Sequence, residues 1–179
     1  MQFFRHLHTV CKHRRLVRKN CFKAGLVWQG LTHDLSKFSA KEFWRGVKYY
    51  QGDRSPQAKE RELFGYSAAW LHHKGRNKHH FEYWTDVNPK GEVVYVEMPA
   101  KYLAEMVCDR IAASKVYKGK DYTDSCPLEY FSARKGKAAM NEKTSERLEY
   151  FLTLLAERGE KEMFKQLKDF VKVSKKKSI

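Results

Sequence analysis

The chain has 179 residues, of which 42% are hydrophobic and 32% charged, and its formal net charge is +15. This length and apolar content predict one domain with a hydrophobic core and argue against wholesale disorder. No apolar run approaches the roughly 18–20 residues that a membrane-spanning helix requires, and the basic N-terminus does not resemble a secretion signal. We therefore expect a cytoplasmic protein without membrane association, while its oligomeric state stays open.

The positive charge predicts an anionic partner, either a phosphorylated small molecule or a nucleic acid. Residues 1–24 contain seven lysines and arginines and no acid, and three lysines occupy 175–177. A solvated basic surface is the simpler interpretation, so nucleic-acid binding remains the alternative. The four cysteines form no CxxC pair, which argues against a zinc finger and favours small buried apolar groups.

The N-terminal third of the chain is predicted to be helical. Apolar residues between Phe3 and Cys21 recur at intervals of three, four and seven, which indicates one face of a helix. Gly25 and Gly30 flank a second short segment. Ser39 with Glu42 three residues later matches a capping box, so we expect a helix to begin there.

The middle of the chain is predicted to alternate loops and short helices. Residues 51–60 are expected to form a polar loop, followed by a helix over Leu63–His73. Asn77 is expected to cap a short helix over residues 79–84. A turn signal and a brief β-prone run predict one short hairpin or extended loop near 88–98.

The C-terminal part is predicted to contain one buried and one amphipathic helical region. Pro99 suits the first turn of a helix that ends near Tyr117, and residues 119–131 are expected to be a loop. Amphipathic helices follow over 140–173, with a break near Gly159. The elements together predict an all-α single domain over residues 1–179 that ends in a basic tail at 174–179.

All eight histidines lie in the first 80 residues, and neutral imidazole is a common ligand of transition metals. His13 lies on the apolar face of the first helix, where an imidazole needs a buried partner. Asp109 lies among apolar residues, where an unpaired carboxylate is costly. A metal ion would satisfy both residues; a hydrogen-bonded core histidine and a buried ion pair are the alternatives. Glu105, one turn before Asp109, would either ligate or orient a ligand.

The order of these residues resembles the H…HD…D signature of the HD-domain superfamily of metal-dependent phosphohydrolases. In chain order the extended pattern consists of His13, His33, Asp34, His73, His79, His80 and Asp109. This H…HD…H…HH…D order is similar to that of HD members with two metal ions, and Lys37 completes their HD-x-x-K form. The stretches HDLSKFSAKEF and HKGRNKHHFEYW also resemble a family of uncharacterised bacterial and phage proteins. The GYP signature of one HD group is absent, so no activity on cyclic dinucleotides is inferred.

The resemblance implies an HD-like helical bundle whose metal-site core spans about residues 8–118. The implied activity is hydrolysis of a nucleotide or other small phosphate ester by a metal-activated water. The implied cofactor is one or two divalent ions, from among Mn, Fe, Co, Ni, Zn and Mg. The implied ligands of the first ion are His13, His33, Asp34 and Asp109. The implied ligands of the second are Asp34, His73, His79 and His80.

Asp34 and Lys37 are the catalytic residues that the resemblance implies, and Lys37 would stabilise charge on the phosphoryl group. The predicted substrate-binding residues are Lys37, Arg76, Asn77 and Arg110. Asn77 is equally suited to positioning the histidine pair or to capping a helix. His6 and His8 remain alternatives to His13, and His73 is preferred to His72 by its fit to the family pattern. The same ligand set also fits a di-iron oxygenase, and a non-catalytic basic protein that binds nucleic acid remains a further alternative.

Overall fold

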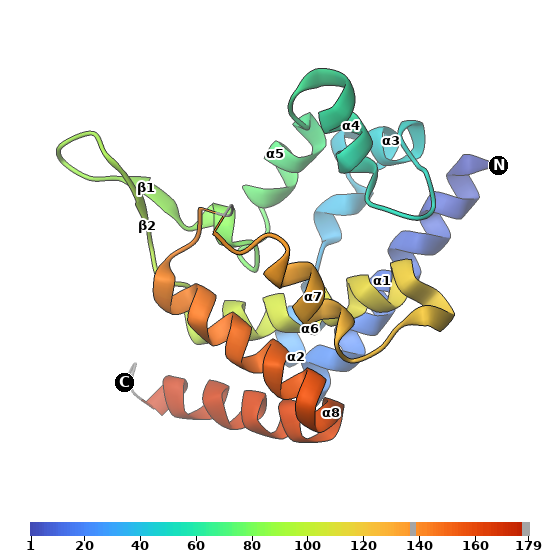
Figure 1. Ribbon diagram of the computed structural model, residues 1–179. Coiled ribbons are helices and arrows are strands. Elements are labelled where there is room, and N and C mark those ends of the chain that lie inside the picture. Colours follow the sequence, from blue (N-terminus) through green and yellow to red (C-terminus); the bar gives the residue numbers. More distant parts are fainter. Residues whose placement is uncertain (137–138, 177–179) are drawn as a thin grey trace.

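The computed structural model describes residues 1–136 and 139–176, and Figure 1 shows how their elements are arranged. In chain order the elements are α1 (Gln2–Lys23), α2 (Val27–Thr32), the 3₁₀ helix η1 (Leu35–Phe38), α3 (Ala40–Lys48), α4 (Pro56–Phe64), α5 (Ala68–Lys74), η2 (Phe81–Tyr83), β1 (Thr85–Val87), β2 (Val93–Tyr95), α6 (Ala100–Lys118), η3 (Gly119–Asp121), α7 (Cys126–Ser132) and α8 (Glu142–Lys176). The described chain is therefore all-α apart from one hairpin, as the sequence predicts.

The hydrophobic core lies where α1, α6 and α8 pack against one another, in the lower half of Figure 1. α1 and α8 each bury an apolar face, and α6 is buried on most sides; Val17, Leu103 and Leu152 are examples that are fully enclosed. The Asn20 side chain on α1 donates a 3.1 Å hydrogen bond to the Cys108 carbonyl on α6. This packing fixes α1 against α6, the two helices that carry the first and last residues of the predicted site.

The longer elements follow the sequence prediction. α1 and α6 match the predicted helices, with Pro99 in the N-cap position of α6. β1 and β2 form the predicted hairpin as an antiparallel pair in which Thr85 faces Tyr95. α8 is interrupted at Gly159, whose φ of 74° is outside the helical region, and its two halves fold back beside each other (Figure 1).

The helix predicted over Leu63–His73 is wrong, because two helices meet inside that range. α4 begins at Pro56, within the segment expected to be a loop, and ends at Gly65 in the left-handed conformation. Ser67 then caps α5 by accepting a hydrogen bond from the Trp70 amide. The terminating Gly65 and the new N-cap Ser67 are only two residues apart, and together they outweigh the helical spacing of the apolar residues.

Three further local predictions are corrected. Ser39 precedes α3, but its side chain forms no cap bond, and the Glu42 carboxylate binds histidines instead of closing a capping box. Asn77 caps no helix, because its amide donates to the His73 carbonyl. The segment 119–131, expected to be a loop, contains most of α7.

α8 continues to Lys176, so the chain is still helical where the basic tail was expected to begin. Residues 177–179 of that predicted tail lie outside the described residues. In the part of the chain that the structure describes, no helix combines the length and apolar character that crossing a membrane demands.

Candidate metal centre

The structure brings the seven residues of the predicted ligand pattern into one cluster, although they come from four parts of the chain. α1 supplies His13, and the turn between α2 and η1 supplies His33 and Asp34. α5 and the turn after it supply His73, His79 and His80, and α6 supplies Asp109. Asp34 is 1% exposed, and the whole cluster is buried or half-buried.

Four of these residues form a first group, whose nitrogen and oxygen atoms lie within 4.8 Å of one another. The Nε2 atom of His13 is 2.9 Å from Oδ1 of Asp109. The Nε2 atom of His33 is 3.4 Å from Oδ2 of Asp34 and 3.5 Å from Oδ1 of Asp109. Two imidazoles and two carboxylates thus converge on one point, which is a ligand set that divalent transition metals accept.

A second group shares Asp34 with the first and adds His73, His79 and His80. The Nε2 atoms of His73 and His79 lie 3.3 and 3.5 Å from Oδ1 of Asp34. Since Oδ2 of Asp34 faces the first group, the two oxygens of one carboxylate point to two neighbouring groups. This arrangement suits a carboxylate that bridges two ions.

The backbone at Asp34 is in the left-handed helical region, with φ 53° and ψ 31°. Among the described residues it is the only non-glycine residue with a positive φ. Aspartate tolerates this conformation better than most residues, but it is still sparsely populated. The left-handed residue follows the end of α2, whose C-cap is His33, and it lets two consecutive side chains, His33 and Asp34, enter the same cluster.

Several buried polar atoms of the cluster form no hydrogen bond in the described structure. They are Nε2 of His13, His33, His79 and His80 and both carboxylate oxygens of Asp34, of which Oδ2 forms an ion pair with Lys37. Native proteins rarely leave such atoms unpaired, because each one costs roughly 1–3 kcal/mol. Lone pairs of this kind, concentrated around one carboxylate, fit divalent cations, which would satisfy them together.

Two buried glutamates orient the imidazole rings. Glu105 Oε1 lies 2.9 Å from Nδ1 of His33 and 3.2 Å from Nδ1 of His79. Glu42 contacts two rings with its two oxygens: Oε1 faces Nδ1 of His72, and Oε2 lies 2.7 Å from Nδ1 of His73. A carboxylate only accepts hydrogen bonds, so each Nδ1 donates, and the opposite Nε2 is left free for a ligand bond.

The electrostatics of the first group favour a cation. Burial raises the pKa of Asp34, but the charges of His33 and Lys37 lower it by more than burial raises it. The net pKa is therefore well below the usual value. Burial likewise opposes ionisation of Asp109, yet the imidazoles of His13 and His33 beside it hold its pKa well below the usual value. Both carboxylates are therefore ionised at neutral pH.

The pKa values of the imidazoles are shifted in different directions. Burial and the charge of Lys37 lower the pKa of His13, and burial with the neighbouring imidazoles lowers the pKa of His80 well below its usual value. Burial also opposes protonation of His33, but the charge of Asp34 and nearby hydrogen bonds raise its pKa well above the usual value. His13 and His80 are thus neutral, the form that binds metals, and the anions around His33 attract positive charge.

Lys37 is the cation closest to the shared carboxylate. Its Nζ atom lies 2.6 Å from Oδ2 of Asp34, and its side chain is 25% exposed. Burial lowers the pKa of Lys37, but the charges of Asp34 and Asp109 raise it to a value above the usual range. A permanently charged ammonium therefore stands between the cluster and solvent.

The other predicted substrate-binding residues are placed differently. Arg76 is exposed, and its guanidinium donates to the His72 carbonyl at 3.4 Å. Asn77 is buried and donates to Ser36 Oγ and to the His73 carbonyl, both at 2.8 Å, so it holds the second group in place. Arg110 follows Asp109 on α6, and its guanidinium lies 5.8 Å from the centre of the Phe131 ring.

The choice among neighbouring histidines is resolved by position. His6 is buried beside Phe43 and Tyr50, away from the two groups defined above, and His8 is exposed. His72 donates to Glu42 at 2.6 Å, whereas His73 faces Asp34. His13 and His73 are therefore the members that join the cluster.

Sequence reasoning missed Glu42 as part of the site, because its position after Ser39 matched a capping box. The available signal was its place on the same helical face as Phe43 and Gly46, which are buried with it. Ser36 was also missed; its hydroxyl lies 3.2 Å from Nδ1 of His73. A serine in a short turn carries no sequence signal of that contact.

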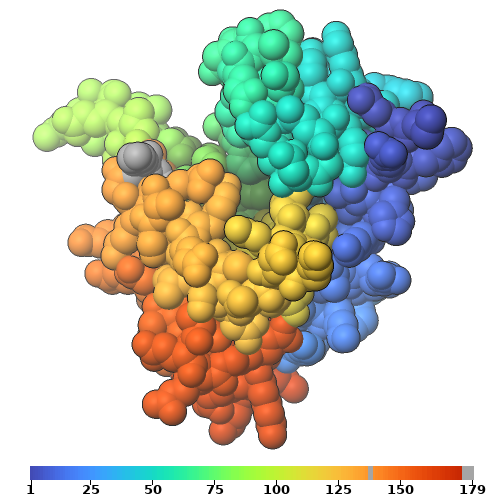
Figure 2. Space-filling model, turned by 45° about the vertical axis from the view of Figure 1, so that its right-hand side comes forward, coloured from blue at the N-terminus to red at the C-terminus, as the bar shows by residue number. Residues whose placement is uncertain are grey.

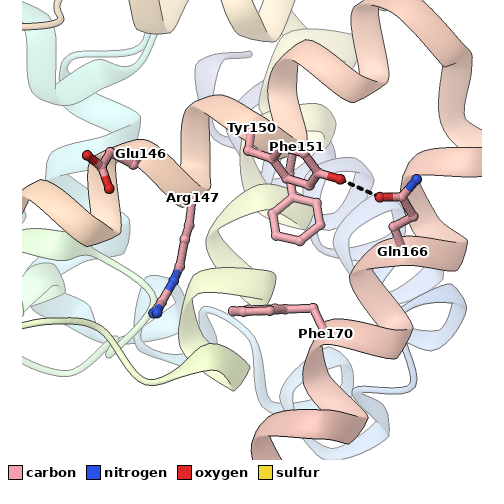
Figure 3. A pocket seen from close by; sticks show the side chains of 6 residues that line it. All are labelled: Glu146, Arg147, Tyr150, Phe151, Gln166 and Phe170. Atoms are coloured by element: carbon pink, nitrogen blue, oxygen red, sulfur yellow. Dashed lines mark hydrogen bonds between the residues drawn. The ribbon is translucent and has the colours of Figure 1, made fainter.

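The described surface is hollowed in more than one place. One, of about 420 Å³, opens between the two halves of α8 and is lined by Tyr150, Phe151 and Phe170 among others; Figure 3 shows Tyr150 bonded to Gln166 across it. The face drawn in Figure 2 is also hollowed between the teal chain around 50–65 and the yellow chain around 115–130. The α8 hollow contains no residue of the cluster, so the chemistry is assigned from side chains and not from cavity size.

The fold and cluster define an all-helical protein with a buried histidine–aspartate centre suited to metal ions. A profile described as a family of unknown function (DUF5662) matches residues 2–154. The chain belongs to this family. Comparison with curated proteins and with solved structures gave no match.

Proposed function

We propose that this protein is a metal-dependent phosphohydrolase that acts on a nucleotide or another small phosphate ester. The observation that carries the proposal is the placement of Asp34, whose two oxygens face two separate groups of buried, unpaired imidazole nitrogens. The ordered resemblance to HD-domain phosphohydrolases supports the same reading.

The residues fit a pair of ions. His13, His33 and Asp109 would hold one ion, His73, His79 and His80 would hold the other, and Asp34 would be shared. Divalent ions bound there would act as Lewis acids on a phosphoryl oxygen and would lower the pKa of a coordinated water.

The protein's own groups prepare the site for an anionic substrate. Lys37 places a charged ammonium at the exposed edge of the cluster, where it would stabilise the charge of a phosphoryl group. Asn77 acts on the ligands and not on the substrate in this proposal, since its amide holds His73 and Ser36. The net charge of +15 would draw phosphate esters toward the protein.

Metal analysis and a substrate panel test the proposal. Purified protein should contain up to two equivalents of a transition metal and should hydrolyse at least one of a set of nucleotides and sugar phosphates. The reactions would contain added Mn, Fe, Co, Ni, Zn or Mg ions. Substitutions His33→Ala and Asp34→Ala should remove both metal and activity, while Arg76→Ala should leave both intact. Full metal content in the His33 and Asp34 variants would refute the site assignment.

A di-iron oxygenase is the second candidate, because three imidazoles in the second group suit iron. It predicts oxygen consumption by iron-loaded protein on adding an organic substrate, and no release of phosphate. A non-catalytic protein that binds nucleic acid is the third candidate, and exposed Arg15, Arg18 and Lys19 on α1 favour it. In that case binding would survive chelation and weaken steeply with salt.

A further inference from the structure

Glu105 occupies an unusual place between the two ligand groups. Its side chain is buried on α6, one turn before Asp109. A single oxygen, Oε1, lies 2.9 Å from Nδ1 of His33, which belongs to the first group. The same oxygen lies 3.2 Å from Nδ1 of His79, which belongs to the second group. One acceptor atom therefore orients one imidazole in each group.

The two rings that share this oxygen are also in contact with each other. The centres of the His33 and His79 rings are 4.4 Å apart, and their planes are inclined by 36°. A rotation of either ring would displace the other or break its bond to Glu105. The orientation of one imidazole is thus mechanically linked to that of the other.

We propose that Glu105 couples the two ligand groups, so that an ion in one group prepares the other group for its ion. This inference rests on the two-ion centre of the proposed function. The first ion would fix the ring of His33, and the shared oxygen would transmit that order to His79. The second ion would then bind to a ring that is already ordered and would lose less conformational entropy, which is positive cooperativity.

A competing interpretation treats Glu105 itself as a ligand, because Glu105, His33 and His79 also lie close enough to hold an ion. Such an ion would need the Nδ1 lone pairs of both rings. A neutral imidazole has only one unprotonated nitrogen, and the Nε2 atoms of both rings already face Asp34 at 3.4 and 3.5 Å. The donated Nδ1 protons assign Glu105 an orienting role.

Glu42 provides a matched control. It is a buried glutamate that also accepts from Nδ1 atoms, but its partners His72 and His73 both lie on α5. Only His73 belongs to a ligand group, and that is the second. Removing this carboxylate should therefore affect one ion, whereas removing Glu105 should affect both.

The experiment titrates the metal-free protein with Co²⁺. Calorimetry and the visible absorption of bound cobalt measure each binding step. We expect wild-type protein to bind two ions cooperatively. Glu105→Leu should weaken both steps by about 10–100-fold each and abolish the cooperativity, as loss of an orienting carboxylate does elsewhere. Glu105→Gln keeps an acceptor oxygen, so it should restore most of the affinity. Glu42→Leu should weaken one step only.

The possible results separate this inference from the proposed function. Two ions bound by Glu105→Leu with wild-type affinities, or a loss confined to one step, would overturn the coupling and leave the phosphohydrolase proposal standing. A third cobalt ion in wild-type protein that disappears in Glu105→Gln would show that Glu105 is a ligand, which also overturns it. Fewer than two ions in wild-type protein would refute both the two-ion centre and the coupling. Circular dichroism of each variant confirms that the comparison is between folded proteins.

Discussion

The substitution Asp34→Asn is the sharpest test of the shared carboxylate. It keeps the size of the side chain and removes its charge. Asparagine also tolerates the left-handed backbone that Asp34 adopts, so the local fold should survive. The change therefore isolates the anionic oxygens that face the first and second ligand groups.

The magnitude follows from the geometry. Imidazole nitrogens of both groups lie 3.3–3.5 Å from the Asp34 oxygens, so ions between them would be within about 4 Å of the charge. At an effective dielectric constant of about 20, two unit charges at that distance interact by about 4 kcal/mol. An energy of this size changes a binding constant by nearly three powers of ten. Lost hydration offsets part of it, and we expect each ion to bind at least about 100-fold more weakly.

The assay measures metal content after dialysis, together with hydrolysis of whichever ester the wild-type protein cleaves. Asp121→Asn removes one exposed carboxylate elsewhere and serves as the control for net charge. It should bind both ions like the wild type. Retention of two tightly bound ions by Asp34→Asn would refute the bridging role, even if activity were lost.

Three further predictions concern ligand choice and stability. His13→Ala should lose one ion in elemental analysis, whereas the exposed His8→Ala should keep both. Gly46→Ala should lower the free energy of unfolding by about 1–3 kcal/mol, because a Cβ there would lie 2.2 Å from the His6 ring. Gly75→Ala, which meets nothing closer than 3.5 Å, should be neutral or stabilising in the same denaturant titration. Burial raises the pKa of Glu160, but hydrogen bonds from Lys115 and Lys23 lower it by more than burial raises it, so the net pKa is below the usual 4.5. Its ion pairs therefore stabilise the fold above that pH and are lost as the pH falls; Glu160→Gln should cost up to about 1 kcal/mol at pH 7, and melting curves should converge with wild type in acid.

The long helices could be predicted from sequence because their signals are repeated many times. α1 and α6 each present apolar residues over several turns, and Pro99 marks where α6 begins. The short elements could not, because one or two residues decide them. Gly65 and Ser67 divide α4 from α5, and neither residue interrupts the apolar periodicity.

The membership of the cluster was predictable only through the resemblance to a known pattern. Periodicity places His13 on an inward face, and Asp109 lies among apolar residues of its helix, but neither signal shows that the two side chains meet. That requires the packing of α1 against α6, a contact between parts of the chain about a hundred residues apart. Glu42 also shows that local sequence does not reveal contacts between distant elements. Its local sequence matches a helix cap, but its partners, His72 and His73, lie two helices away.

The cluster departs from the local consistency that marks the rest of the fold, and its departures share one cause. Asp34 adopts a sparsely populated backbone conformation, and several imidazole Nε2 atoms around it are buried without hydrogen bonds. Both features cost free energy in the isolated chain. The core of α1, α6 and α8 holds the flanking helices rigidly enough to maintain them. A bound cation would recover that energy at the same atoms, so the features that weaken the fold locally are those that suit the cluster to a metal ion.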